Sequence, residues 1–195
     1  MIFGKISYFI EFDNFSLEIR VDEELSVSYS RRFRGADAQF VFVVAEVWLH
    51  QSGVMRLIIP SSRPGNFLEE IKDLIARVLS PPLVPGIEQV IACGGWSFWM
   101  GGYWIRVEGD CNFHDDEIMY DRLSLALFDE SEFGYIAIYK FNGKNIFEVS
   151  SRGEGMVGVW SEFDLSVLRN QLVSLRGSIY SAVHQVLILT DRFEK

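Results

Sequence analysis

Hydrophobic and polar residues alternate along much of the first sixty residues, and a period of two is that of a half-buried β-strand. This alternation predicts strands over Ile6 to Glu11, Ser16 to Val21 and Leu25 to Tyr29. A longer apolar run, Phe40 to Leu49, leads into the turn-like Gln51-Ser52-Gly53, and Val54 to Ile59 follows as its hairpin partner. The first part of the chain is therefore predicted to form a mostly antiparallel sheet.

After Pro60 the apolar residues follow the three- and four-residue spacing of an amphipathic helix. We predict a helix over 66–79, with Asn66 as its N-cap and Ser80-Pro81-Pro82 ending it. A second amphipathic helix is predicted over 162–179, with one apolar face formed by Phe163, Val167, Leu168, Leu172 and Leu175. The apolar segment Val183 to Leu189 is predicted to be a closing strand.

The second half returns to strand patterns after a boundary at residues 80–89, which hold three of the five prolines. Strands are predicted over Val90 to Cys93, Tyr103 to Val107, Leu123 to Phe128, Tyr135 to Phe141 and Asn145 to Val149. Asn142-Gly143 joins the last two, because both residues tolerate the positive φ of a type I′ turn. The whole pattern predicts an α+β fold with mostly antiparallel sheets and two main helices.

Two arrangements of the halves stay open. The chain is either one compact unit over 1–195, or two similar β-β-β-β-α halves over 1–80 and 90–195. Two pairs of short matches motivate the second arrangement: Ile19-Arg20-Val21 with Ile105-Arg106-Val107, and Ser61-Ser62-Arg63 with Ser150-Ser151-Arg152. Such matches also arise by chance, so the shared order of strands followed by a helix carries more weight.

Composition limits the class and the compartment. Hydrophobic residues make up 49% of the chain and aromatic residues 14%, which is typical of a chain that folds by itself. The two cysteines, Cys93 and Cys111, form no disulfide or zinc pattern, and free thiols fit a reducing cytoplasm. No secretory signal is recognisable, and the run Phe40 to Leu49 is shorter than the ~20 residues that a membrane helix needs. We therefore expect a cytoplasmic protein that does not bind a membrane.

The charge is unevenly distributed. The formal net charge is −9, and nine acidic residues fall between Glu108 and Glu132, where the one base is Arg122. A protein that binds phosphates needs clustered Lys and Arg. The distribution therefore argues against direct nucleic-acid binding and predicts a dense acidic surface.

A Gly-rich aromatic segment occupies residues 94–104. It lacks the glycine spacing of a phosphate-binding loop, and its bulky centre would crowd a phosphate. We interpret it as an aromatic strand between bends. Three roles stay open for its Trp96, Trp99 and Trp104: packing in the core, contact at an interface, or lining a ligand pocket.

The remaining candidate chemistry is sparse. The run His114-Asp115-Asp116-Glu117 is interpreted as a solvated acidic loop, because adjacent loop residues seldom converge on one ion. His50 and His184, like His114, lie in no recognisable nucleophile motif. We therefore predict no catalytic residue, no metal and no cofactor.

The C-terminal part shows a particular order of elements: a hairpin from Ile136 to Val149, a polar loop, and Trp160-Ser161-Glu162-Phe163 opening an amphipathic helix. This order, in a small acidic chain without catalytic motifs, resembles the bacterial immunity proteins of toxin systems such as contact-dependent growth inhibition. The resemblance covers Tyr135 to Ile179 and implies a cytoplasmic inhibitor that binds a cognate protein toxin. It implies no particular binding residues, because such proteins differ from one another at the surfaces that meet their toxins.

The charge distribution then predicts a binding face. Toxin nucleases are basic where they hold phosphates, and an acidic patch associates rapidly with such a surface. The predicted face combines acidic residues with tryptophans: Asp110, Asp115, Asp116, Glu117, Asp121, Trp96, Trp99 and Trp104.

Two other functional classes stay open. A ligand-binding or enzymatic domain would use a cleft between the halves, lined by the Trp-rich segment 94–104. A structural subunit would present a broad apolar patch or a self-complementary dimer face. The sequence leaves the oligomeric state undefined.

Overall fold

The computed structural model describes residues 3–33, 40–61, 65–81, 128–130, 134–151 and 157–193. The elements in chain order are β1 (Lys5–Glu11), β2 (Ser16–Asp22), α1 (Glu23–Phe33), β3 (Ala45–Gln51), β4 (Val54–Ile59), α2 (Phe67–Leu79), β5 (Phe128–Glu130), β6 (Gly134–Phe141), β7 (Lys144–Ser151), β8 (Val157–Glu162) and α6 (Leu165–Phe193). The strands form two antiparallel sheets, ordered β1-β2-β3-β4 and β5-β6-β7-β8. The predicted α+β class with mostly antiparallel sheets is confirmed.

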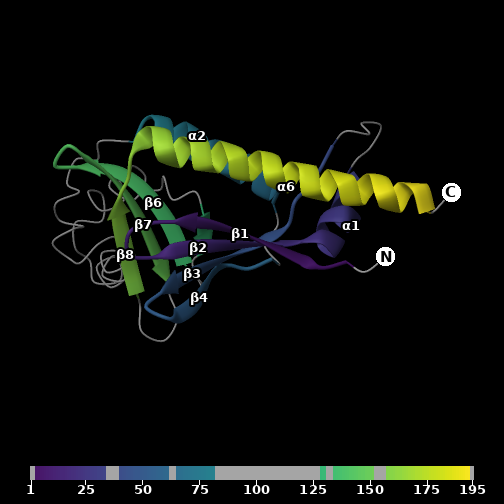
Figure 1. Ribbon diagram of the computed structural model, residues 1–195, viewed down its shortest axis with the longest axis horizontal. Helices are drawn as coiled ribbons and strands as arrows, with labels where there is room; N and C mark the ends of the chain where they lie inside the picture. The colour runs from purple at the N-terminus through teal and green to yellow at the C-terminus, as the bar shows by residue number, and fades with distance from the viewer. Residues whose placement is uncertain are drawn as a thin grey trace, which may run out of the picture.

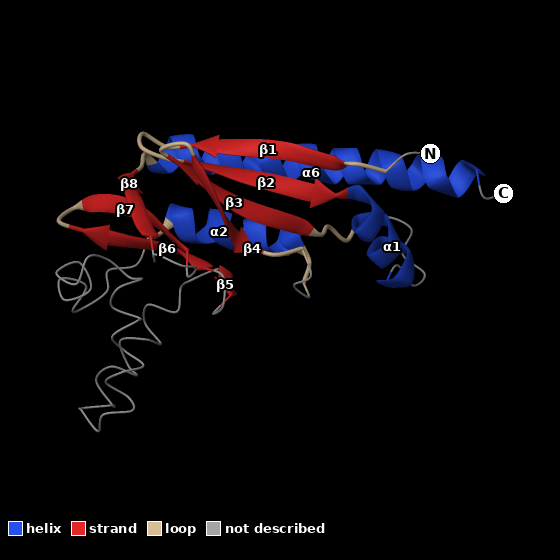
Figure 2. Cartoon of the chain, turned by 90° about the horizontal axis from the view of Figure 1, so that it is seen from below, coloured by secondary structure: helices blue, strands red, loops and turns tan. Residues whose placement is uncertain are grey.

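The long helix α6 runs along the length of the molecule (Figure 1). Figure 2 shows the first sheet in front of the helices, with α6 behind β1 and β2 and α2 behind β3 and β4. The second sheet lies at one end of the first sheet, and α1 lies at the other end. The first sheet therefore has an inner face packed on helices and an outer face that no described element covers.

Strand β2 shows how the alternating sequence builds this arrangement. Leu17, Ile19 and Val21 are buried and belong to the core. Glu18 and Arg20 alternate with them, so both side chains lie on the outer face.

Two predicted hairpin turns are confirmed. Ser52 and Gly53 join β3 to β4 with φ angles of 50° and 78°, and Asn142 and Gly143 join β6 to β7 with 49° and 78°. Two consecutive positive φ angles define a type I′ turn, whose twist matches that of the flanking strands.

The predicted helix over 66–79 is also confirmed, with Asn66 as its N-cap. The Asn66 side-chain oxygen accepts from the backbone N–H of Leu68 at 3.2 Å and from that of Val43 at 3.1 Å. Its amide nitrogen donates to the carbonyl of Val41 at 3.2 Å. One side chain thus caps α2 and fixes the segment that leads into β3.

The predicted strand over Leu25 to Tyr29 is wrong, because these residues lie in α1. The reason is the pair Ser26 and Ser30, which are one helical turn apart and buried. Their hydroxyls accept from the backbone N–H of Val44 at 3.0 Å and of Phe42 at 2.7 Å. The helix therefore satisfies the backbone of residues 42–44, and the predicted strand from Phe40 begins only at Ala45.

The second predicted helix begins later and ends later than expected. Trp160 to Glu162 belong to β8, and Asp164 caps α6 by accepting from the N–H groups of Ser166 at 2.8 Å and Val167 at 3.0 Å. The strand predicted over Val183 to Leu189 is wrong, because α6 continues to Phe193. Ile179, Val183 and Leu187 are buried at four-residue steps, which extends the apolar stripe of the helix.

Both sheets and both long helices share one hydrophobic core. Phe12, beyond the end of β1, stacks on Phe15 and on Phe147 of the second sheet, with ring centroids 4.5 and 4.6 Å apart. Leu172 of α6 and Ile71 of α2 lie in the same cluster. Neither sheet therefore buries its apolar face by itself.

Several predictions fall outside the described residues. These are the strands over Val90 to Cys93 and Tyr103 to Val107, most of the strand over Leu123 to Phe128, and one member of the first tripeptide pair. Ser150 and Ser151 lie in β7, with β8 between them and α6, whereas Ser61 lies between β4 and α2. The order of elements therefore differs at this point, and a duplication stays a prediction.

Gly134 lies where the backbone of β7 and a side chain of the first sheet approach closely. A Cβ at this position would lie 2.2 Å from the carbonyl oxygen of Ser150 and 3.2 Å from Ile58 of the first sheet. We expect Gly134→Ala to lower the free energy of unfolding by at least about 2 kcal/mol, since backbone cannot yield as a side chain can. The control is Gly177→Ala in α6, whose Cβ would meet nothing within 4 Å. It should raise stability by about 0.5–1 kcal/mol, and urea denaturation measures both.

Candidate partner-binding groove

The eight residues predicted to bind a partner lie outside the described residues. They are Trp96, Trp99, Trp104, Asp110, Asp115, Asp116, Glu117 and Asp121. The segment 94–104, which is the alternative cleft lining, lies outside them as well. These assignments stay predictions.

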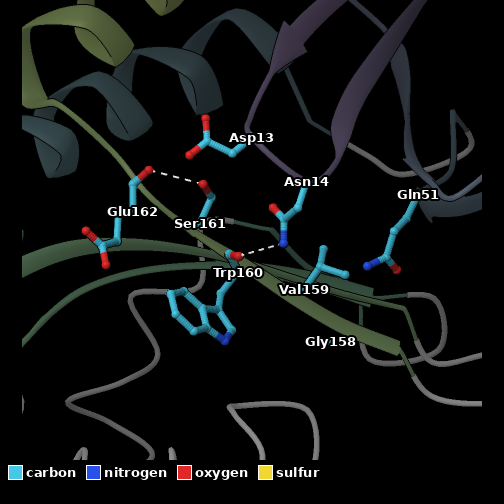
Figure 3. A pocket seen from close by; sticks show the side chains of 8 residues that line it. All are labelled: Asp13, Asn14, Gln51, Gly158, Val159, Trp160, Ser161 and Glu162. Carbon is cyan, nitrogen blue, oxygen red and sulfur yellow. Dashed lines mark hydrogen bonds between the residues drawn. The ribbon is translucent and has the colours of Figure 1, made fainter.

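A groove of about 660 Å³ lies where the first sheet meets β8. Asp13, Asn14 and Gln51 line it from the turn after β1 and the end of β3, and residues 158–162 line it from β8. It continues past Asp13 and Glu162 into a smaller hollow of about 170 Å³ beside the start of α6. Figure 3 shows Asp13, Asn14 and Gln51 along one side of β8.

The turn between β1 and β2 sets the position of Asp13 and Asn14. Phe12 and Phe15 flank these two residues, their rings stack, and the N–H of Phe12 donates to the carbonyl of Phe15 at 2.9 Å. Phe15 is buried, while Asp13 and Asn14 are exposed. The aromatic anchors therefore hold the turn against the core and present its polar tip to the groove.

Asn14 ties this turn to the second sheet. Its side-chain amide donates to the backbone carbonyl of Trp160 at 3.2 Å (Figure 3). β8 is an edge strand, and among the described residues no strand pairs with its outer side. The bond from Asn14 therefore satisfies a backbone carbonyl on that side. The indole of Trp160 extends on the other side of β8 and is 53% exposed.

Carboxylates dominate the rim of the groove. Glu11, Asp13, Glu162 and Asp164 line the two hollows, and Lys144 forms an ion pair with Glu162. Hydrogen bonds from Ser166 and Val167 lower the pKa of Asp164, so this carboxylate is charged at neutral pH. An exposed tryptophan beside an acidic groove is a combination suited to a basic protein surface.

A second polar cluster lies on the outer face of the first sheet, around Glu18. Glu18 is only 5% exposed. Arg20 donates to both of its oxygens at 2.7 and 2.8 Å, and Ser7 donates at 2.7 Å. The Nε2 atom of His50 lies 2.7 Å from the same carboxylate.

These contacts favour the charged form of the Glu18 carboxyl group. The hydrogen bonds from Arg20 are the main cause that lowers the pKa of Glu18 to about 2, against the opposing effect of burial. The Arg20 guanidinium in turn lies 4.8 Å from the ring centre of Trp48. All the acceptor positions of this carboxylate are engaged, so the cluster organises the outer face rather than offering a free general base.

Around this cluster the outer face carries exposed apolar side chains. Phe9 is 54% exposed and meets the His50 ring edge-on at 6.0 Å. Met55 is also exposed, and its sulfur lies 3.1 Å from Arg20. Within the part of the chain that the structure describes, no group of three or more His, Cys, Asp or Glu side chains is placed to hold a metal ion.

No protein-family model matches the chain, and comparisons with curated proteins and with solved structures give no match either. The resemblance to immunity proteins therefore gains no support from these comparisons. Functional inference depends on the surface itself.

Helix α6 has a composition that sequence reading did not single out. Over Leu165–Asp191 it is long and apolar enough to cross a membrane by length and composition. Its buried stripe packs into the shared core, and core helices of soluble proteins meet the same criterion. The cytoplasmic location stays a prediction.

Sequence reasoning missed both described clusters. Glu18 and Arg20 are two residues apart on a strand, a spacing that places both side chains on one face, and this signal was available. Asp13 and Asn14 sit between two phenylalanines, which also marks an anchored turn. Trp160 was noted in the sequence, but its position on an edge strand required the fold.

The engaged state of Glu18 predicts an acid-sensitive stability. In the unfolded chain the carboxyl takes up a proton near pH 4.5, whereas the folded protein keeps it charged until about pH 2. The stabilisation is therefore full above about pH 5 and is lost as pH falls towards 2, a loss on the order of 2 to 3 kcal/mol. We expect Glu18→Gln to lower stability at pH 7 by a similar amount and to flatten this part of the pH profile.

The control for Glu18→Gln is Glu24→Gln, because Glu24 is exposed on α1. It should leave stability at pH 7 and the slope below pH 5 close to those of the unchanged protein. Chemical denaturation between pH 2 and 7 measures both variants. Equal slopes for Glu18→Gln and the unchanged protein would refute the role given to the cluster.

Proposed function

We propose that this protein is a protein-binding inhibitor, of the immunity type, that neutralises a cognate toxin by covering a basic surface. The observation that carries the proposal is the acidic groove with Trp160 beside it. An acidic total charge of −9 adds to it.

The proposed mechanism has two components. Carboxylates on the groove, with Asp13 at its centre, would attract a basic partner and accelerate association, and this effect weakens as salt screens the charges. The Trp160 indole would bury a large apolar area in the complex and slow dissociation. Acids would thus govern the rate of encounter, and the tryptophan the lifetime.

The alternative is a ligand-binding or enzymatic domain. The groove volume of about 660 Å³ is within the range of small-molecule sites. Its rim is acidic and its walls are shallow turns and an edge strand, so a cationic ligand would be the matching class. A protein partner is favoured because Trp160 lines the groove while its exposed indole extends to the other side of β8, so that a broad partner surface can cover both.

A growth-rescue assay tests the proposal. The product of the gene immediately upstream is expressed as the toxin candidate, with and without this chain, and the purified pair is measured by titration at low and high salt. We expect rescue, together with an affinity that falls as salt rises. Absence of both rescue and binding would contradict the proposal and favour the ligand-binding alternative.

Two variants then locate the surface. Asp13→Lys should weaken binding about tenfold and reduce its salt dependence, and Trp160→Ala should mainly raise the dissociation rate. The matched control is Glu24→Lys, which makes the same charge change on exposed α1, at the far end from the groove. If all three variants bound the partner alike, the groove would not be the binding surface.

A further inference from the structure

Strand β1 is an edge of the first sheet. β2 pairs with one side of it, and no described strand pairs with the other. The bonds that flank the β1–β2 ladder, Phe12 to Phe15 and Glu23 to Gly4, show which residues face β2. Hydrogen-bonded pairs alternate, so the backbone groups of Lys5, Ser7, Phe9 and Glu11 point away from β2.

The sequence of β1 is self-complementary in the antiparallel direction. It reads Lys-Ile-Ser-Tyr-Phe-Ile-Glu. A two-fold axis through Tyr8 would pair Lys5 with Glu11 of a second copy, and Ile6 with Ile10. In this register Ser7 of one copy lies opposite Phe9 of the other. Both residues direct their backbone N–H and C=O groups away from β2, so they can form the hydrogen-bonded pairs of an antiparallel ladder.

Helix α6 has a second self-complementary pattern on the same side of the molecule. Arg176 reaches α2 by donating to the carbonyl of Leu68 at 3.1 Å, so it marks the side of α6 that faces α2. At about 100° per residue, the opposite flank carries Val167, Gln171, Ser174, Ser178, Ala182, Gln185 and Leu189. Figure 2 shows α6 behind β1 and β2 and α2 behind β3 and β4, so the flank that faces away from α2 lies towards the β1 edge of the sheet.

This flank, from Val167 to Leu189, suits contact with an identical helix. An antiparallel copy centred on Ser178 would place Val167 against Leu189, Gln171 against Gln185, and Ser174 against Ala182. Val167 and Leu189 are among the exposed large hydrophobic residues, at 55% and 44%. Arg176 is the one charged residue between 170 and 190, and it points the other way.

The two patterns share one axis. Glu11 and Phe12 lie beside Leu168 and Gln171 in the smaller hollow, and Ile10 lies with Leu172 and Leu175 in the core. A strand advances about 3.3 Å and a helix about 1.5 Å per residue, so stepping back from Ile10 to Tyr8 moves four to five residues along α6. Tyr8 is therefore level with residues 177–179, where the helix pattern has its centre.

We propose that the protein forms a two-fold symmetric dimer in which the β1 strands of two copies pair antiparallel and the α6 flanks pack beneath them. The two first sheets become one eight-stranded sheet. Lys5, which also pairs with Glu46 of its own sheet at 2.9 Å, comes opposite Glu11 of the second copy, and this charge complementarity favours the register. The serines and alanine near the axis allow the helices to approach closely. This interface does not depend on the proposed inhibitor function and is measured on the isolated chain.

The first test is the mass in solution. Light scattering after size exclusion should give twice the 22.4 kDa of one chain. Ser7→Pro removes an outward N–H without touching the β1–β2 ladder, and two such bonds are lost per dimer. It should raise the dissociation constant at least about tenfold. Ser7→Ala is the matched control, because it loses the same hydroxyl contact to Glu18 but keeps the N–H.

The second test fixes the geometry by cross-linking. In a background with Cys93 and Cys111 replaced by serine, Ser178→Cys should form a disulfide dimer under mild oxidation. Asn170→Cys is also at an exposed position but lies eight residues, or about 12 Å, from the axis, and should not cross-link. A monomeric protein would overturn the proposal. So would a dimer that Ser7→Pro leaves intact and Ser178→Cys fails to trap.

Discussion

The contact of Phe12 with Phe147 is the constraint on which the rest of the structure depends. Phe147 is fully buried in the second sheet, and Phe12 comes from the turn after β1 in the first. A sheet of four strands cannot hide its apolar face without a covering layer. Here the covering layer, α2 and α6, is shared, so the sheets are joined through one core. The aromatic anchor of that core also sets the Asp13 turn against β8 and thereby forms the groove.

The outer face of the first sheet follows from the same constraint. With both helices on the inner face, its polar residues must satisfy one another. Glu18 does so through Arg20, Ser7 and His50, and Glu46 through Lys5 and Trp48. The result is a rigid polar network with Phe9 and Met55 exposed around it. A buried ion pair is weak support for stability by itself, but its hydrogen bonds restrict the face to one arrangement.

Sequence patterns within a few residues predicted the elements that depend on short-range interactions. The β1–β2 and β6–β7 strands, the Asn142-Gly143 turn and the Asn66 cap all follow from patterns within a few residues. The α1 segment failed because Leu25, Val27 and Tyr29 alternate like a strand, and the decisive role of Ser26 and Ser30 requires the distant backbone of residues 42–44. Val183 to Leu189 failed because a short apolar run does not separate strand from helix by period. The groove could not be predicted, since its two walls are far apart in sequence.

The edges of the two sheets differ in how they are covered. An unpaired strand edge is a site for unwanted pairing, and proteins protect such edges with charges or cover them. β4 lies beside the second sheet, and Asn14 occupies a carbonyl of β8. Among the described residues β1 has neither kind of cover, and its two charged residues are of opposite sign at opposite ends. A single repeated sign would repel a second copy in every register, whereas this arrangement disfavours shifted pairings and favours one.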